Sequence, residues 1–315
     1  MTASAIQKQQ YNNLKNRVNT TGRLIGGTPL FEISNVYCKA GVRILAKLEW
    51  QQLGGSVKAR PAFNIIRRAI ESGALTEDKI LLDATSGNTG IAYASIGAAL
   101  GIKVTLCLPE NASEERKRIL TALGVDIVYT SRFEGTDGSQ LKAKELAQAY
   151  PDRYYYADQY ANEANWKAHY ETTAPEIIQG TNGTITHFVA GLGTTGTFTG
   201  TGRALKEYNP NIELVALQPN NPMHGLEGWK HLETAIVPKI YDNTLADVFE
   251  EVDTLEAYEM LKTFAAKEGM LIGPSAAANL LGAIQVAERI EEGVIVTTFA
   301  DDASKYSELT KKFFS

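Results

Sequence analysis

The sequence predicts an α/β protein with two coupled lobes, each built on a mostly parallel, twisted sheet flanked by helices. Short apolar runs alternate with amphipathic segments along the chain, which favours parallel sheets wrapped by helices. The chain has 315 residues, enough for one large or two ordinary domains. No internal repeat and no Pro/Gly-rich linker separates the lobes. We therefore expect closely coupled lobes with the active site in the cleft between them.

Short apolar runs predict buried strands, and the amphipathic segments between them predict helices. The strands are expected at residues 80–84, 104–108, 126–129, 187–190, 214–217 and 294–299. The helices are expected at residues 90–100, 114–123, 140–149, 197–207, 255–267 and 276–290, with a further helical pattern from Pro61 onward. Ser113 is expected to be the N-cap of the helix at 114–123, which places Glu114 and Glu115 at the positive end of its dipole.

The composition argues against several classes of protein. A net charge of −5 is not typical of a nucleic-acid-binding protein, which carries a basic face. The longest strongly apolar stretch, residues 80–102, is interrupted by Asp83, Asn88 and several glycines, so it predicts a buried strand and helix and not a membrane span. The four histidines show no His-x-x-x-His spacing, so no metal site is expected.

The cysteines and the N-terminal segment bear on the cellular compartment. Cys38 and Cys107 lie far apart in the sequence, which predicts reduced, buried thiols in a cytoplasmic protein. Residues 1–23 contain basic side chains and no acidic ones. This segment is interpreted either as a plain N-terminal arm, which its Asn- and Gln-rich composition favours, or as a transit peptide.

The first of three candidate segments for chemistry begins with Gly54-Gly55 and contains Lys58. Lys58 lies just before a helical pattern, and Pro61 suits the first turn of that helix. The positive end of a helix dipole can keep a lysine partly neutral and nucleophilic. A glycine turn with a solvated lysine is the alternative interpretation.

The second segment, residues 85–90, lies between a predicted strand and a predicted helix. It contains the small hydroxyl residues Thr85, Ser86 and Thr89. A turn of this kind at a helix N-terminus forms an anion site, and its glycines let backbone amides approach a ligand. Ordinary helix capping by Ser or Thr is the alternative.

The third segment, residues 191–197, also connects a predicted strand to a predicted helix. Its backbone amides and hydroxyls can surround a phosphate. The phosphate-binding candidates are Gly193, Thr194, Thr195, Gly196 and Thr197. With Gly191, the glycines also match the dinucleotide fingerprint Gly-x-Gly-x-x-Gly. That fingerprint expects an acidic residue after the next strand, where this chain has Gln218, which weakens the case for NAD.

Together and in this order, the three segments resemble the fold-type II family of pyridoxal-phosphate enzymes, with a tryptophan synthase β-like fold, and within it the B-type cysteine synthases. The resemblance extends from Gly26-Gly27-Thr28-Pro29-Leu30 to Ala300-Asp301 and includes Lys47-Leu48-Glu49, Asp158-Gln159-Tyr160, His169-Tyr170 and Pro175-Glu176-Ile177. It implies a smaller mobile lobe of residues 46–153, which carries the loop for the substrate carboxylate. Residues 1–45 and 154–315 would form the larger, cofactor-binding lobe.

The resemblance also implies roles for individual residues. Lys58 would form the Schiff base with pyridoxal phosphate, residues 193–197 would hold its phosphate, and Asn88 would bond its 3′ oxygen. Ser275 would face the pyridine nitrogen, where a neutral hydroxyl makes the ring a milder electron sink than a carboxylate would. The substrate carboxylate would be bound by Thr85, Ser86, Thr89 and Gln159.

The implied reaction is a β-replacement that makes L-cysteine from O-acetyl-L-serine and sulfide, or another sulfur donor. Lys58 would act as the general base, and the reaction would pass through an aminoacrylate. Lys230 stands where B-type relatives often carry an arginine, and a cation there would favour an acidic substrate such as O-phosphoserine. A solvated surface lysine is the alternative interpretation of Lys230.

The chain departs from the family pattern at three alanines. Ala59 replaces the usual aspartate after the lysine, and Ala276 and Ala277 replace a hydroxyl residue and a glycine after Ser275. The alternatives that remain open are a cystathionine β-synthase-like activity and a catalytically silent regulatory homologue, whereas Val57 and Pro61 argue against a serine or threonine dehydratase. The resemblance implies a homodimer and a possible partner, the C-terminal tail of serine acetyltransferase.

Overall fold

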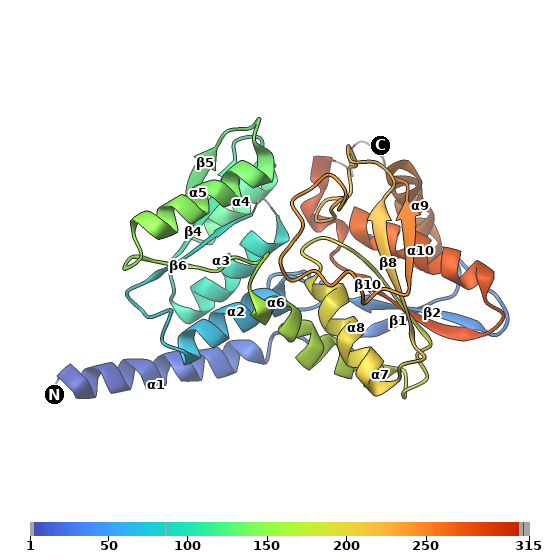
Figure 1. The fold of residues 1–315 in the computed structure, drawn as a ribbon, viewed down its shortest axis with the longest axis horizontal. Coiled ribbons are helices and arrows are strands. Elements are labelled where there is room, and N and C mark those ends of the chain that lie inside the picture. The colour runs from blue at the N-terminus through green and yellow to red at the C-terminus, as the bar shows by residue number, and fades with distance from the viewer. Residues whose placement is uncertain (1–2, 86, 309–310, 312–315) are drawn as a thin grey trace.

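Two sheets organise the part of the chain that the computed structural model describes, residues 3–85, 87–308 and 311 (Figure 1). The larger sheet has the strand order β1-β2-β10-β7-β8-β9, with β1 (Leu30–Ile33), β2 (Val42–Leu48), β7 (His187–Gly191), β8 (Glu213–Pro219), β9 (Val248–Val252) and β10 (Gly293–Phe299). The smaller sheet has the order β5-β4-β3-β6, with β3 (Ile80–Ala84), β4 (Val104–Pro109), β5 (Asp126–Thr130) and β6 (Tyr154–Tyr156). Neighbouring strands are parallel except β1 and β2, so the predicted fold class is confirmed.

Helices connect these strands and cover both sheets. They are α1 (Ala3–Gly22), α2 (Ala59–Glu71), α3 (Asn88–Leu100), α4 (Glu114–Ala122), α5 (Gly135–Ala149), α6 (Glu163–Ala168), α7 (Ala174–Gly180), α8 (Gly196–Tyr208), α9 (Thr254–Glu268) and α10 (Pro274–Arg289), with a π-helical turn at His169–Thr173 and a 3-10 turn at Ala303–Lys305. The predicted strands correspond to β3, β4, β5, β7, β8 and β10, and the predicted helices to α2, α3, α4, α5, α8, α9 and α10. Ser113 is the N-cap residue of α4, as expected, although its side chain makes no capping hydrogen bond.

The larger sheet is buried on both faces, and the two-residue repeat of its strands supplies both cores. Along β10, Ile295 packs into one core and Val296 into the other, because successive side chains point to opposite faces. Helices α9 and α10 complete the first core, and α7 and α8 complete the second. Central strands of this kind carry continuous apolar runs, which is why the sequence predicts β7, β8 and β10 so directly.

The smaller sheet packs on α2 and α3 at one face and on α5 at the other. Leu14 and Val18 of α1 join the first of these cores, so the N-terminal segment is a helix attached to the smaller sheet. Cys107 of β4 is fully buried as predicted, but Cys38 is exposed, so the prediction that both thiols are buried was wrong. None of the helices that the structure describes is long and apolar enough to cross a membrane.

The expected lobe boundaries, at residues 46 and 153, do not coincide with the division of the chain into two sheets. Residue 46 lies inside β2, a strand of the larger sheet, and β6 follows residue 153 but belongs to the smaller sheet. The assignment of residues 46–153 to a mobile lobe stays a prediction. The two sheets lie side by side, with α2 and α6 in the region between them (Figure 1).

A buried ion network fixes the start of α2 to the larger sheet. Arg60 donates from Nε and Nη2 to both oxygens of Glu49, at 2.7 and 2.8 Å, and from Nη1 and Nη2 to both oxygens of Glu176, each at 2.7 Å. Lys47 completes the network with an ion pair to Glu176 at 2.7 Å and a hydrogen bond to the carbonyl of Thr28 at 2.6 Å. Two cations thus balance two carboxylates inside the protein, as burial of charge requires.

The network accounts for several short motifs of the sequence at once. Gly27 donates its N–H to Glu176 at 3.0 Å, and a Cβ on Gly26, whose φ is +81°, would lie 2.9 Å from the same carboxylate. Burial by itself would raise the pKa of Glu176, but the hydrogen bonds and charges of Arg60 and Lys47 lower it to about 2. The residues of Gly26-Gly27-Thr28, Lys47-Leu48-Glu49 and Pro175-Glu176-Ile177 therefore meet at one point.

Replacement of Arg60 by leucine is expected to destabilise the protein by about 3–5 kcal/mol, because it leaves the buried carboxylate of Glu49 and the partly buried one of Glu176 without their main partner. The free energy of unfolding in urea measures this. Arg43→Leu is the matched control, since Arg43 and Glu32 form an ion pair about half exposed to solvent, and its loss should cost about 0–1 kcal/mol. Equal losses for the two variants would contradict the structural role of the network.

The lowered pKa of Glu176 predicts a specific loss of stability in acid. A carboxyl group with a folded-state pKa of about 2 and an ordinary value of 4.5 stabilises the protein above pH 4.5, and this stabilisation is lost as the pH falls toward 2. Urea midpoints measured across this range should fall more steeply for the unmodified protein than for Glu176→Gln, which cannot titrate. Parallel curves for the two proteins would refute the assignment.

Candidate active site

A cavity of about 790 Å³ opens at the carboxyl ends of strands from both sheets. Its walls come from the segments that follow β3, β4 and β6 in the smaller sheet and β7, β8 and β10 in the larger one. Ligands of parallel α/β sheets bind at this edge. The predicted site residues that line the cavity are Lys58, Thr85, Asn88, Thr89, Gln159, Gly193, Thr194, Thr195, Thr197, Lys230 and Ser275. Gly196 begins α8 beside it, and Ser86 lies outside the described residues.

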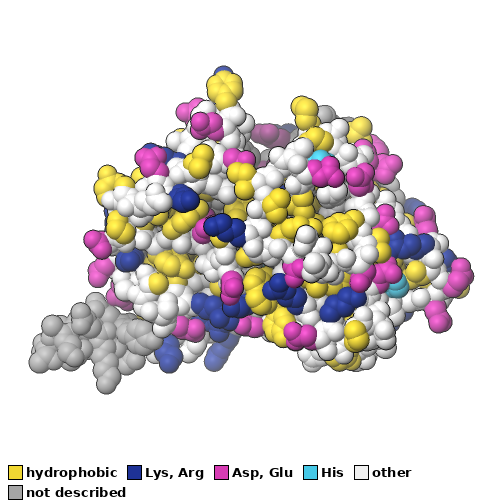
Figure 2. Space-filling view, viewed as in Figure 1, with side chains coloured by type: hydrophobic (Ala, Val, Ile, Leu, Met, Phe, Trp, Pro, Cys, Tyr) yellow, Lys and Arg dark blue, Asp and Glu magenta, His cyan; other side chains and the backbone are white. Residues whose placement is uncertain are grey.

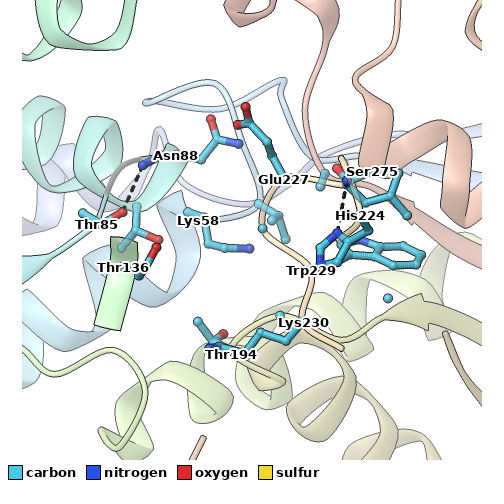
Figure 3. Close-up of a pocket in the computed structure, with 18 of the residues that line it drawn as sticks. Lys58, Thr85, Asn88, Thr136, Thr194, His224, Glu227, Trp229, Lys230 and Ser275 are labelled. Atoms are coloured by element: carbon cyan, nitrogen blue, oxygen red, sulfur yellow. Dashed lines mark hydrogen bonds between the residues drawn. The ribbon is translucent and has the colours of Figure 1, made fainter. Parts of the chain in front are cut away.

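Lys58 occupies the centre of the cavity, as Figure 3 shows. It is the N-cap residue of α2, as the sequence predicts, and its neighbour Val57 donates its N–H to the carbonyl of Ala300 at 2.8 Å. Burial lowers the pKa of the Lys58 amine, while the charges of Asp301 and Glu49 oppose this shift. The amine is therefore more often neutral, and so more nucleophilic, than a lysine in solvent.

The glycine-rich segment after β7 has the shape of a phosphate cradle. Thr195 adopts a positive φ of +70°, which is unusual for a threonine, and is the N-cap residue of α8. A Cβ on Gly193 would lie 1.9 Å from the carbonyl oxygen of Gly228, and one on Gly196 would lie 2.0 Å from Oδ1 of Asn165. The chain can follow this path only with glycine at both positions, and the path directs the N-terminus of α8 toward the cavity.

The hydroxyl groups of this cradle differ in their hydrogen bonding to the described residues. The hydroxyl of Thr195 is buried and makes no hydrogen bond, a costly state that a bound oxygen would relieve. Thr194 instead accepts a hydrogen bond from Asn165 at 3.2 Å, and Thr197 contacts Nε2 of His169 at 3.3 Å. Burial lowers the pKa of His169 to about 3, so its ring is neutral behind the cradle. The cradle thus offers helix-end amides and hydroxyls to an anion without a basic side chain.

The turn after β3 faces the cradle from the smaller sheet. Thr85 accepts a hydrogen bond from the N–H of Gly87 at 3.2 Å. Thr89 donates to the side chain of Gln159 at 2.8 Å, and Gln159 donates to the carbonyl of Ala84 at 3.1 Å. The structure therefore brings Gln159 to the turn of Thr85 and Thr89, although Gln159 lies 70 residues after Thr89 in the sequence.

Asn88 contacts a group for which the sequence predicts no role. Its Nδ2 donates to Oδ2 of Asp301 at 2.7 Å, while its Oδ1 is buried without a partner. The same Asp301 oxygen accepts a hydrogen bond from Tyr306 at 2.7 Å. Burial raises the pKa of Asp301, against the hydrogen bonds from Tyr306 and Asn88. The position of Asp301, just after β10 at the ligand-binding edge of the sheet, was a signal that could have identified it.

Ser275 lies in the first turn of α10, across the cavity from Thr85 (Figure 3). The three alanines that depart from the family pattern, Ala59, Ala276 and Ala277, are fully buried, so a polar residue at any of them would need a new partner. Lys230 is not a solvated surface lysine, because it lines the cavity with its Nζ 5.2 Å from the centre of the Tyr160 ring. Burial lowers the pKa of Lys230.

The sequence residues 22–301 match the family model described as pyridoxal-phosphate dependent enzyme. The chain belongs to this family. It is 48% identical over 300 residues to a cysteine synthase of Aquifex aeolicus (strain VF5), covering 93% of this chain and 91% of that protein. It is 37% identical over 289 residues to an O-acetylserine dependent cystathionine beta-synthase of Bacillus subtilis (strain 168), covering 90% of this chain and 94% of that protein.

A solved structure agrees with these relatives. The crystal structure of a cysteine synthase from Entamoeba histolytica superposes with a TM-score of 0.87 at 32% identity, covering 92% of this chain and 90% of that one. The resemblance drawn from the sequence motifs and the fold-type II class are thereby confirmed, and the cofactor of this family is pyridoxal phosphate. The site suits that cofactor, because it combines a lysine of lowered pKa with an anion cradle that contains an unpaired buried hydroxyl.

A methyl group at the cradle should abolish cofactor binding. Gly193→Ala places its Cβ against the backbone carbonyl of Gly228, which cannot move away as a flexible side chain would. We expect the purified variant to lose the visible absorption of bound pyridoxal phosphate while its circular dichroism stays that of a folded protein. Gly124→Ala is the control for backbone strain alone: its φ of +76° disfavours alanine but nothing lies within 4 Å of its Cβ, and it should retain the absorption.

Proposed function

We propose that this protein is a transferase that makes L-cysteine from O-acetyl-L-serine and sulfide by β-replacement. The observation that carries the proposal is the convergence of Lys58, the anion cradle and the Thr85–Thr89–Gln159 group on one cavity. The relative of 48% identity named cysteine synthase supports the same reaction. Related β-replacement reactions begin with the same loss of the leaving group and differ in the nucleophile that then adds to the β-carbon.

The sequence resemblance assigns the residues that would hold pyridoxal phosphate, and their positions around the cavity support the assignment. Lys58 would be its covalent attachment point, and residues 193–197 would bind its phosphate through backbone amides and the Thr195 hydroxyl. The amide of Asn88 would bond the ring oxygen, and Ser275 would meet the ring nitrogen. When bound, the cofactor supplies an electron sink for negative charge at the substrate α-carbon.

The side chains of this chain then bind the substrate and move the proton. Thr85, Thr89 and Gln159 would hold the amino-acid carboxylate through hydroxyl and amide donors, which orients the α-hydrogen toward Lys58. The free Lys58 amine, with its pKa lowered by burial, would take that proton and hold it at Nζ while acetate leaves. Sulfide then adds to the β-carbon, and the proton returns from Lys58 to the α-carbon.

Closure of the smaller lobe would exclude water during these steps. We propose that residues 46–153 move as this lobe, apart from β2 and the start of α2, which pair with the larger sheet, since this range carries the turn that would bind the carboxylate. The homodimer, the cytoplasmic location and the docking of a serine acetyltransferase tail stay predictions from the sequence resemblance.

A second candidate substrate is O-phosphoserine. Lys230 and Arg116 both line the cavity, and a cation close to the leaving group would stabilise a phosphate as it departs. O-Acetylserine remains our first choice, since the cavity also contains the carboxylate of Glu227.

Addition of O-acetylserine without sulfide should change the visible spectrum of the purified protein. We expect a yellow protein whose absorption band moves to longer wavelength and persists until sulfide is added, when cysteine appears. Lys58→Ala should bind the cofactor without covalent attachment and show no such change. If the protein is yellow but its absorption band does not move, the result supports the cofactor and refutes O-acetylserine as the substrate. A colourless protein that pyridoxal phosphate cannot restore would refute both.

A further inference from the structure

Arg116 and Glu227 form an ion pair that joins the two sides of the cavity. Arg116 belongs to α4, beside the smaller sheet, and Glu227 lies in the loop after β8 of the larger sheet. Both residues line the cavity. The Arg116 side chain is only 7% exposed, whereas that of Glu227 is 49% exposed. The carboxylate thus meets a buried guanidinium from the solvent side.

Other contacts hold the guanidinium of Arg116 close to the turn proposed to bind substrate. Its carbon lies 5.4 Å from the centre of the Tyr306 ring, and the Tyr306 hydroxyl bonds to Asp301. A Cβ built on Gly87 would lie 3.8 Å from Nη1 of Arg116, so the guanidinium borders the Thr85–Thr89 turn. The side chain of a substrate bound at that turn would therefore lie close to Arg116.

The charges around the cavity are uneven. Among the described residues that line it, Lys58, Arg116 and Lys230 are basic, and Glu227 is the one carboxylate. The planar fork of Arg116 can bind a phosphate through two parallel hydrogen bonds, and Glu227 competes with a phosphate for it. With Glu227 in place, that fork already holds an anion.

We propose that Glu227, by pairing with Arg116, is a specificity-determining residue that selects a substrate with an uncharged acyl ester and disfavours one with a phosphate ester. This inference rests on the proposed function and names the class of substrate that the same cavity prefers. A phosphate would have to displace the carboxylate of Glu227 or lie against it, and like charges brought together oppose binding. An acetyl carbonyl is neutral and can accept a hydrogen bond without displacing the pair.

The test compares kcat/KM for O-phosphoserine and O-acetylserine, with sulfide as acceptor, in the holoenzyme and its Glu227→Gln variant. We expect the ratio of the two values to shift toward O-phosphoserine by about 10–100-fold, because the variant removes the carboxylate that pairs with Arg116 and that repels a phosphate. Glu233→Gln is the matched control, since Glu233 is exposed in the same loop and does not line the cavity, and it should leave the ratio unchanged. An unchanged ratio in Glu227→Gln would overturn the proposal.

Two double variants identify the partner of the phosphate. In the Glu227→Gln background, Arg116→Gln should return the ratio toward that of the unmodified enzyme, whereas Lys230→Met should leave most of the shift in place. The opposite pattern would assign the phosphate to Lys230 and overturn the role of the pair. Visible absorption of the bound cofactor and circular dichroism confirm that each variant is folded.

A binding measurement separates this inference from the proposed function. The probe is L-2-amino-4-phosphonobutyrate, a phosphonate isostere of O-phosphoserine that has no leaving group, titrated into each holoenzyme by calorimetry. Glu227→Gln should bind it at least about tenfold more tightly than the unmodified protein does. Tighter binding with no cysteine formed from either ester would refute the proposed function alone. Equal affinity would refute the inference even if O-acetylserine is a substrate.

Discussion

Arg60 is held between two carboxylates that come from different parts of the chain, Glu49 after β2 and Glu176 on α7. Because Arg60 lies in the first turn of α2, this pairing determines where that helix begins and so where Lys58 stands. The network is electrically balanced, and Arg60, Lys47 and Glu49 are buried from solvent, so their hydrogen bonds tolerate little displacement. The lysine that performs the proposed chemistry is positioned by neighbours that never touch the substrate.

The sequence predicted the strands that are buried on both faces, because burial alone requires apolar residues along them. The central strands are apolar along their length because helices cover both faces of the sheet. The strands that the sequence did not reveal are β1, β2, β6 and β9, and three of these lie at sheet edges. An edge strand such as β9 carries Glu250 and Glu251, which conceal it from a search for apolar runs. In β2 the obstacle is Lys47, whose burial depends on Glu176, a partner distant in sequence.

The sequence predicted those parts of the site where the backbone conformation requires particular residue types. Glycines and small hydroxyl residues between a strand and a helix mark an anion site, and the cradle and the Thr85–Thr89 turn both have this pattern. Arg116 gave no such signal, because it stands among charged neighbours on a helix and resembles a solvated side chain. Its burial follows from the packing of α4 against the C-terminal segment and the loop of Glu227. Charges that meet across a cleft depend on tertiary structure and leave no local pattern.

The last described part of the chain completes a cavity whose other walls come from earlier segments. Lys305 donates to the carbonyls of Gly54 and Gly55, in the loop that carries Lys58, Ala300 accepts the N–H of Val57, and Ser307 bonds to Glu115 of α4. During translation these residues leave the ribosome after all the elements that they join. A nascent chain whose residues 300–307 are still inside the ribosome therefore lacks a finished active site, so the onset of cofactor capture waits for this segment to emerge.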